Sequence, residues 1–332
     1  MSRTWDQSIV FLRIANLNIQ IEAEHPDLKL TVKGPTARFL AGPNETDISV
    51  SARFARLGST PSGPLLFDTG GVWRLFQDGD GYELRFFVPW SDTPYKAASF
   101  DRSFTKGIVT LNPDFFSPNA ELDPLEFPLD ELVVIFHLAQ RGGALLHACG
   151  VVDRDRTGYL FSGNSGDGKT TIARLWQNSG AEAILSDDRV ALTLSAQNVM
   201  MHGTPWHGEA GYSSPTSVRL DRLFFLRHGK TNRITLLNPA ETTVRLLARS
   251  FLPFHDSELV TKTLELHETI ARHVPAYDFE FLPDESAIAY ARATKESGLT
   301  GGAALQIQDN KIQSPQNLSG ELLARTSNGE RP

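Results

Sequence analysis

The sequence predicts a β-rich first domain over residues 1–115 and an α/β domain with a mixed sheet over residues 145–296, joined by residues 116–144. Three observations indicate this division. Apolar and polar residues alternate with period two in the first third, four prolines fall within residues 112–128, and strand-length apolar runs alternate with helical spacing beyond them. With 332 residues, 40% of them hydrophobic, the chain can bury two cores.

The first domain is expected to consist of half-buried strands. Apolar residues alternate with polar neighbours over residues 17–21, 28–32 and 47–54. Residues 72–88 indicate two strands joined by a turn at 78–81, because glycine and aspartate adopt turn conformations that other residues resist. The charged residues occur at strand spacing and are interpreted as a solvated face. We therefore assign no chemistry to this domain.

A helix is predicted over residues 128–140, within the connecting segment. Pro128 suits the first helical position, and Asp130 and Glu131 lie in the first turn, where acids interact favourably with the helix dipole. Two glycines at 142–143 then end the helix. Its apolar residues are interpreted as core.

The second domain is expected to begin with a β-hairpin. Its arms are the apolar runs 144–153 and 158–163, which a short polar turn separates. Residues 181–194 and 198–206 are again strand-like. Helices are expected at 239–250 and 257–273, and the polar, glycine-rich residues 297–332 are expected to form a mobile tail with little function of its own.

Composition narrows the partners and the compartment. The formal net charge is -7 and the basic residues are scattered, so no nucleic-acid partner is expected. Cys149 is the single cysteine and lies in an apolar run, which indicates a small buried residue in a reducing compartment. No basic leader opens the chain and no apolar run approaches the ~20 residues of a membrane span. We therefore expect a cytoplasmic protein without a membrane partner.

A glycine-rich loop follows the second arm of the hairpin. Its residues match the pattern G-x-x-x-x-G-K-[ST], with an apolar strand before it and a helical pattern after it. Such a loop turns backbone N–H groups toward phosphate oxygens, and the helix N-terminus adds positive charge. The predicted contacts to ATP or a similar nucleotide are Gly163, Asn164, Ser165, Gly166, Asp167, Gly168, Lys169, Thr170 and Thr171.

Within this loop, two side chains have separate tasks. Lys169 is suited to place its charge between the β- and γ-phosphates, and the Thr170 hydroxyl is suited to ligate Mg²⁺. The alternative interpretation is a plain glycine turn at the start of a helix.

Two adjacent carboxylates, Asp187 and Asp188, end the next apolar run. Neighbouring residues at a strand end point in different directions, so one carboxylate can hold Mg²⁺ while the other accepts the proton of a nucleophile. This is the arrangement that phosphoryl transfer needs. The alternative is a solvated strand end at which Arg189 pairs with its neighbours.

Two further segments carry candidate residues. His147 interrupts an apolar run and is either a core histidine or a group beside the phosphates, where it assists transfer or tunes the adjacent acid. Residues 202–214 contain a proline and three glycines and are predicted to form a loop. In that loop Glu209 is a candidate second Mg²⁺ ligand and His207 a candidate substrate contact. Zinc is disfavoured because the histidine spacing matches no structural site.

The segments "HACGVV", "FSGNSGDGKTT" and "LSDDRV", in this order, resemble the catalytic domain of bacterial HPr kinase/phosphorylase. More distantly, the loop resembles that of ATP-dependent phosphoenolpyruvate carboxykinase. The resemblance covers about residues 145–210 and implies a P-loop kinase domain of that type. It also implies the following roles: phosphate binding by Lys169, Mg²⁺ binding by Thr170 and Asp188, deprotonation of the acceptor hydroxyl by Asp187, and assistance near the phosphate by His147.

The chain departs from this family after the acid pair. HPr kinases carry a glycine- and isoleucine-rich signature there that helps hold HPr, whereas this chain has "GTPWHGEAGYSS", which leaves Glu209 as the candidate metal-binding acid. HPr kinases are hexameric, so the resemblance also implies a homo-oligomer. The whole chain resembles the HPr-kinase-related proteins of uncertain substrate, some of which occur with peptide-modification systems.

The expected function is ATP- and Mg²⁺-dependent transfer of the γ-phosphoryl group to a hydroxyl. The acceptor is a serine or threonine of a protein or peptide, or a small alcohol. A second hypothesis is a non-catalytic ATP-binding switch or scaffold, which needs the loop but not Asp187 as a base. Carboxykinase activity is disfavoured because the second metal site and the substrate-binding set of that enzyme are not found in the chain.

Overall fold

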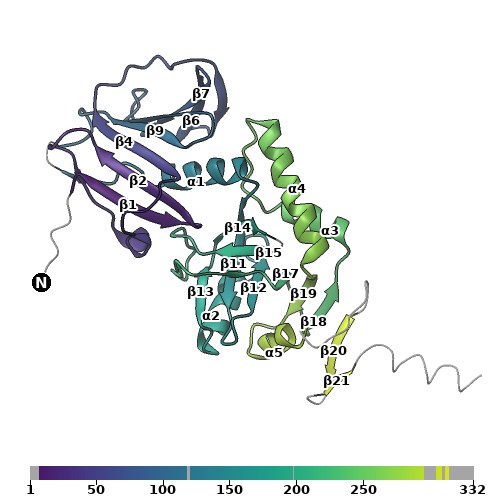
Figure 1. Cartoon of the computed structure of the whole chain (residues 1–332). Coiled ribbons are helices and arrows are strands. Elements are labelled where there is room, and N and C mark those ends of the chain that lie inside the picture. The colour runs from purple at the N-terminus through teal and green to yellow at the C-terminus, as the bar shows by residue number, and fades with distance from the viewer. Residues whose placement is uncertain (1–6, 118–119, 197, 295–303, 309–310, 314–332) are drawn as a thin grey trace, which may run out of the picture.

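The computed structural model describes residues 7–117, 120–196, 198–294, 304–308 and 311–313. Its strands form an eight-stranded sheet early in the chain, an eleven-stranded sheet later in the chain, and a small two-stranded sheet. Helix α1 (Leu129–Gln140) lies between the two large sheets, as Figure 1 shows. The expected mixture of helices and sheets is therefore present.

The first sheet has the strand order β1-β2-β4-β9-β8-β7-β6-β5. Burial alternates along β2 and β4, as the period-two pattern predicts. The hairpin turn is confirmed, because Asp78 pairs with Gly81, whereas the strand predicted over 28–32 is only two residues long. The elements are β1 (Ile9–Ile14), β2 (Leu17–Ala23), β3 (Lys29–Leu30), the 3-10 helix η1 (Gly34–Phe39), β4 (Ile48–Phe54), β5 (Leu65–Asp68), β6 (Trp73–Asp78), β7 (Gly81–Phe86), β8 (Lys96–Phe100), β9 (Lys106–Leu111) and β10 (Glu121–Leu122), which pairs with β3.

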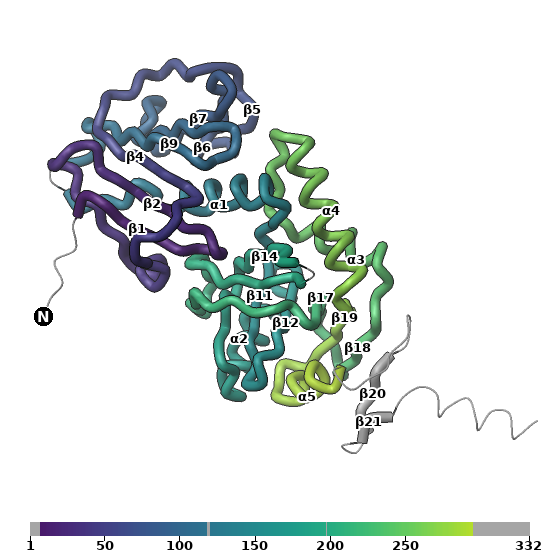
Figure 2. Tube along the Cα trace, viewed as in Figure 1, coloured from purple at the N-terminus to yellow at the C-terminus, as the bar shows by residue number. Residues whose placement is uncertain are grey.

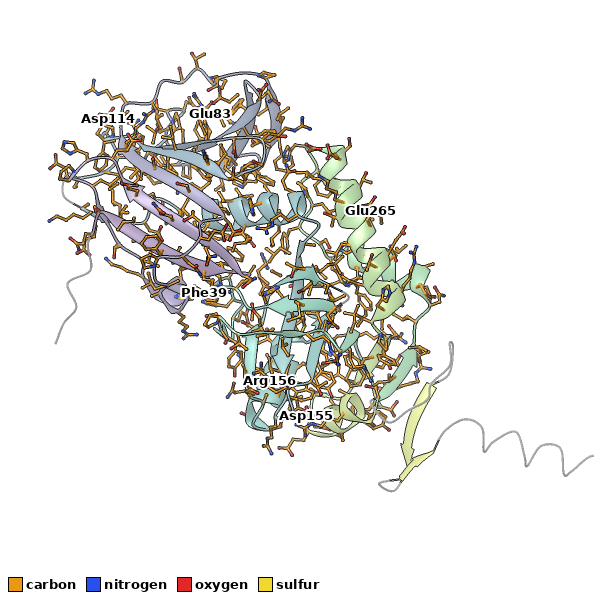
Figure 3. The ribbon with its side chains drawn as sticks, viewed as in Figure 1. Phe39, Glu83, Asp114, Asp155, Arg156 and Glu265 are labelled. Carbon is orange, nitrogen blue, oxygen red and sulfur yellow. The ribbon has the colours of Figure 1, made fainter. Side chains whose placement is uncertain are left out.

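Not all charged residues of this sheet face solvent. Glu83, labelled in Figure 3, is buried on β7 and pairs with the buried Arg85 at 2.8 Å. Lys96 is fully buried, lies over the ring of Phe86 and contacts Glu126 at 3.3 Å. The interpretation of the charged residues as a solvated face was wrong for Glu83 and Arg85, because the cost of burying each charge is offset by its buried partner. The partner of Lys96, Glu126, is exposed.

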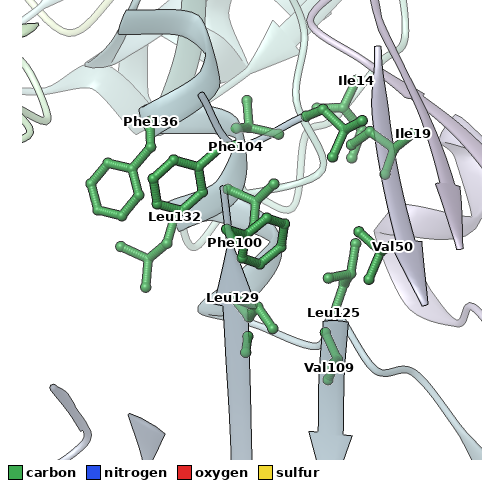
Figure 4. Close-up of a cluster of buried hydrophobic side chains, with 14 of the residues drawn as sticks. Ile14, Ile19, Val50, Phe100, Phe104, Val109, Leu125, Leu129, Leu132 and Phe136 are labelled. Atoms are coloured by element: carbon green, nitrogen blue, oxygen red, sulfur yellow. The ribbon is translucent and has the colours of Figure 1, made fainter. Parts of the chain in front are cut away.

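Helix α1 belongs to the core of the first sheet. Leu129, Leu132 and Phe136 pack with Phe100 and Phe104 in one buried cluster (Figure 4). The predicted helix is confirmed, with Pro128 just before its first residue. Its first-turn acids, Asp130 and Glu131, are both buried. They reach the second sheet, as described below.

The second sheet has the order β16-β15-β14-β11-β12-β17-β19-β18-β20-β21, with β13 also pairing with β11. The predicted hairpin is confirmed as the antiparallel pair β11–β12. Strands β12, β17 and β19 are parallel, which makes the sheet mixed. Its strands are β11 (Ala144–Val152), β12 (Gly158–Ser162), β13 (Ala183–Ser186), β14 (Arg189–Ser195), β15 (Asn198–His202), β16 (Ser217–Arg219), β17 (Arg222–His228), β18 (Arg233–Leu236), β19 (Ala276–Phe281), β20 (Ala304–Gln308) and β21 (Lys311–Gln313).

Helices cover both faces of this sheet. Helices α2 (Lys169–Asn178) and α5 (Ser286–Ala293) pack on one face. Helices α3 (Pro239–Leu247) and α4 (Ser257–His273) lie side by side and pack on the other (Figure 2). The helix predicted over 239–250 therefore ends earlier. Among the helices of the described residues, none is sufficiently long and apolar to cross a membrane.

The predicted tail, residues 297–332, lies mostly outside the described residues. Strands β20 and β21 fall within it, and β20 pairs with β18. A continuous tail without secondary structure was therefore the wrong expectation for these two segments.

Candidate functional site

The glycine-rich loop, residues 163–168, connects β12 directly to α2. Gly166 and Gly168 have φ of 88° and 101°, values that favour glycine. A Cβ at Gly168 would lie 2.5 Å from the Phe281 ring, so this position also needs the absence of a side chain. The Asp167 carboxylate accepts from the Asn164 N–H and braces the loop from inside. The local chain thus has the strand, turn and helix that its pattern predicts.

Lys169 is the first residue of α2 and points back into the loop. Its Nζ donates to the main-chain oxygens of Gly163 and Asn164, both at 2.9 Å. The side chain is nearly buried, and this burial lowers the pKa of Lys169 to about 8, with the charges of Arg249 and Arg189 acting in the same direction. The ammonium is therefore held inside the loop that was predicted to bind phosphate.

The acids Asp187 and Asp188 directly follow the end of β13, as predicted, and form the junction between β13 and β14. Both strands pair with β11, which on its other side pairs with β12. The acids are thus two strand spacings from the loop, about 10 Å between backbones. Cys149 lies on β11, the strand between them, and is fully buried as predicted. Burial and the charge of Asp187 raise the pKa of its thiol, and the charge of Lys169 opposes this rise.

His147 lies on β11 beside the second acid. Its Nδ1 is 3.0 Å from Asp188 Oδ1 and 3.4 Å from Arg189 Nη1. Burial, together with the charges of Lys169, Arg189 and Arg249, lowers the pKa of His147 to about 4. The ring is therefore neutral at pH 7, and the shorter contact is a hydrogen bond from Nδ1–H to the carboxylate instead of an ion pair. The contact with Asp188 is the one that the predicted tuning of an adjacent acid by His147 requires. The role itself stays a prediction.

Asp187 is enclosed by the loop that follows β15. Its carboxylate oxygens accept from the N–H groups of Gly208 at 3.0 Å and Ala210 at 2.9 Å, and the residue is 1% exposed. A Cβ at Gly208 would lie 2.8 Å from Asp187 Oδ2, so glycine permits this close approach. The solvated strand end considered above is therefore wrong for Asp187. For Asp188 its pairing part is correct, since Arg189 contacts that carboxylate.

Glu209 lies between the two residues whose amides bind Asp187, and its side chain is exposed, as is that of His207. Within the described ranges, no group of three or more His, Cys, Asp or Glu side chains is arranged to hold a metal ion. Nucleotide-bound Mg²⁺ typically takes one or two protein ligands and completes its shell with phosphate oxygens and water. The half-buried Asp188 and the half-buried hydroxyl residue Thr170 fit that donor set.

A cavity of about 330 Å³ opens beside the loop, and its cationic residues were missed by the sequence analysis. Arg227 and Arg245 pair with Asp278 at 2.8 and 2.7 Å. Arg249 Nε is buried and has no hydrogen-bond partner among the described residues. In the sequence, Arg245 and Arg249 are four residues apart in a predicted helix. Arginines on the exposed face of an ordinary surface helix have the same spacing, so it did not indicate a cavity. The complete lining is Asn164, Asp167, Phe225, Leu226, Arg227, Arg245, Arg249 and Asp278.

Comparisons with known proteins add little to this geometry. No protein-family model matches the chain, and no curated protein matches it in sequence. Among solved structures, the chain is similar to the HPr(Ser) kinase/phosphatase from Coxiella burnetii, with 12% identity and a TM-score of 0.28, over 46% of this chain and 99% of that one. A likeness at this TM-score carries no conclusion about activity.

Proposed function

We propose that this protein is an ATP- and Mg²⁺-dependent phosphotransferase that moves the γ-phosphoryl group to a hydroxyl. The observation that carries the proposal is the order of three neighbouring chain segments. Strand β12 leads into the glycine-rich loop, β11 presents His147, and the β13–β14 junction presents two carboxylates. A phosphate cradle, surrounding cations and a carboxylate base are the groups that phosphoryl transfer needs in one site.

The loop receives the polyphosphate. Loops of this pattern turn N–H groups toward phosphate oxygens, and the start of α2 adds its positive end. Lys169 exchanges its two main-chain acceptors for a phosphate oxygen, which is a charge-assisted and stronger partner. Arg249, whose Nε has no partner among the described residues, borders the same cavity and adds positive charge there.

Asp188 and the Thr170 hydroxyl are the protein ligands of Mg²⁺, with Glu209 as a further ligand. Bound Mg²⁺ supplies neutralisation of the charge on the transferring phosphoryl group. Asp188 must give up its contact with Arg189 to act in this way. Arg189 then keeps Glu131, which contacts its Nε at 2.7 Å. His147 orients Asp188 through its Nδ1–H.

Asp187 takes the proton of the acceptor hydroxyl. Because both of its oxygens are bonded to loop amides and the residue is buried, the segment Gly208–Ala210 must open before a hydroxyl reaches it. The acceptor hydroxyl belongs to a serine or threonine of a protein or peptide, or to a small alcohol. Gly208 and its neighbours thus control access to the base.

The experiment is transfer of radiolabel from γ-labelled ATP with Mg²⁺ to candidate proteins, peptides and alcohols, with ADP release measured in parallel. Lys169→Ala should abolish transfer, because the loop loses its only cation that reaches the phosphates from inside. Normal turnover in that variant would contradict the proposal. Tight ATP binding by the unchanged protein, with no ADP formed under any acceptor, would favour the non-catalytic switch instead.

A further inference from the structure

We propose that the first sheet positions the twin acids of the second, through Asp130, Glu131 and Arg38. The inference rests on the proposed function for what the acids do, and it assigns a role to the first part of the chain. These three residues do not touch the glycine-rich loop in any described contact. They act on the junction that carries Asp187 and Asp188, each through a different neighbour.

The first contact runs through Trp206. Asp130 Oδ2 accepts from Trp206 Nε1 at 2.8 Å, and both residues are buried. The Trp206 carbonyl in turn accepts from Ser186 Oγ at 2.8 Å. Ser186 Oγ also accepts from the N–H of Asp188 at 3.1 Å. A continuous chain of hydrogen bonds therefore links the first turn of α1 to the backbone of the second acid.

The same tryptophan fixes the loop around the first acid. Trp206 lies two residues before Gly208, whose N–H bonds Asp187, and four before Ala210, which bonds the other carboxylate oxygen. A displacement of the Trp206 backbone would therefore move both donors. Asp187 depends on them because its carboxylate is buried and a buried acceptor without donors is strongly disfavoured.

A second contact holds the far end of this loop. Arg38 Nη1 donates to the carbonyl oxygen of Ser213 at 2.9 Å and lies 3.1 Å from its hydroxyl. Ser213 forms a β-bridge with Ser186, directly before the acids. Arg38 comes from η1, and the adjacent Phe39 is buried in the core of the first sheet. Both ends of the loop over 206–213 are thus tied to the first sheet.

Glu131 provides the third contact, through charge. Its Oε1 lies 2.7 Å from Arg189 Nε, and Arg189 also contacts Asp188. Glu131 is buried, so in a low dielectric its charge strongly affects Arg189. With Glu131 present, Arg189 has a second partner, and Asp188 can leave it without leaving a half-buried cation unpaired.

Helix α1, which carries Asp130 and Glu131, is firmly packed. The remainder of α1 is packed into the apolar cluster of Figure 4, including Leu129 directly before Asp130. Burial raises the pKa of Asp130 to about 7, as expected where apolar surroundings disfavour the charged form. Well-packed apolar residues would join α1 to the second sheet at lower cost. An acid at this position is better explained by the donor that it holds than by stability alone.

The test measures hydrogen exchange in the full chain for Asp130→Leu and for the matched control Asp130→Asn, which keeps an acceptor oxygen for Trp206. Asp130→Leu should speed exchange of the amides at Gly208 and Ala210 at least tenfold and leave α2 unchanged, whereas Asp130→Asn should stay close to the unchanged protein. Trp206→Phe keeps the aromatic packing but removes the donor. It should speed exchange at the same two amides, which keeps the test decisive if Asp130→Leu folds poorly.

Unchanged exchange at 208–210 in Trp206→Phe would overturn the inference. A uniform rise that includes α2 would also overturn it, since it would show a general structural role. These readouts need no kinase activity, so they separate this inference from the proposed function. Where transfer is observed, Asp130→Leu and Trp206→Phe should each lower kcat about tenfold at constant nucleotide affinity. Their double variant should lose no more than either alone, because both changes break one contact.

Discussion

The glycine-rich loop and the acid junction are held in place in different ways. The loop is braced from within, since Lys169 and Asp167 bond main-chain groups of residues 163–164. The acid junction is held by distant parts of the chain. Asp130 lies 76 residues from Trp206, and Glu131 lies 58 residues from Arg189. The geometry of the loop is thus fixed by residues close along the chain, whereas the positions of the acids depend on contacts with distant segments.

The largest expected effect is on the rate of phosphoryl transfer, and it distinguishes the role of the acids from that of the loop. Asp187→Asn should lower the rate of phosphoryl transfer by about 10²–10⁴-fold and leave nucleotide affinity unchanged, because the amide keeps an oxygen for the loop amides but accepts no proton. Asp188→Asn should instead weaken the Mg²⁺ dependence of nucleotide binding. Both are measured by single-turnover transfer and by nucleotide titration with and without Mg²⁺. A lowered nucleotide affinity in Asp187→Asn would contradict the comparison, because it would mean that the acid junction also contributes to nucleotide binding.

A smaller effect is expected from the loop itself. Gly168→Ala should lower nucleotide affinity about tenfold or more, because the new Cβ combines an unfavourable φ of 101° with contact at 2.5 Å to the Phe281 ring. Gly166→Ala is the matched control, with φ of 88° and no atom within 4 Å of the new Cβ. Calorimetric titration of nucleotide compares them. Equal losses in the two variants would mean that backbone strain, and not the Phe281 contact, decides the effect.

The smallest expected effect concerns the pH dependence of stability and His202, the last residue of β15 before the loop that encloses Asp187. His202 contacts Ser217 through Nδ1 and Thr193 through Nε2, both at 2.8 Å. Burial, together with the charge of Arg13, lowers the pKa of His202 to about 4. The unfolded chain therefore binds this proton more readily, so the contribution of His202 to stability is complete above about pH 6.5 and is lost as the pH falls toward 4.

His202→Gln cannot be charged and should remove this part of the acid sensitivity. Urea unfolding at pH 5 and pH 7 should show a loss of stability on acidification that is smaller by about 1–2 kcal/mol than in the unchanged protein. The same substitution at the exposed His25 should leave the difference between the two pH values as it was. A His202→Gln variant with the full acid sensitivity would contradict the assignment.

Sequence patterns were sufficient where the interacting residues are close along the chain. The hairpin β11–β12, the strand–loop–helix segment and the helix α1 were predicted because period, turn residues and capping act over a few positions. The division of the chain into functional domains and the roles of the site residues stay predictions. They concern ligands and chemistry, which a fold does not contain.

The missed features all depend on pairs of residues far apart in the sequence. Asp130 and Glu131 have the pattern of ordinary first-turn acids, and nothing nearby indicates Trp206 or Arg189 as partners. Arg245 and Arg249 have the spacing of a surface helix face, although they border the cavity beside the loop. Glu83 and Arg85 alternate as solvent-facing residues would, yet they are buried together. A buried polar residue is recognisable only when its partner is known.

The lowered pKa of Lys169 would make the proposed nucleotide binding depend on pH. Its burial brings its pKa to about 8, so in mildly alkaline solution a sizeable fraction of the amine is neutral. A polyanion in the loop would favour the ammonium form, which raises this pKa. If the loop binds nucleotide as proposed, capture under such conditions would be coupled to proton uptake from the buffer. The occupancy of the loop would then respond to alkalinity.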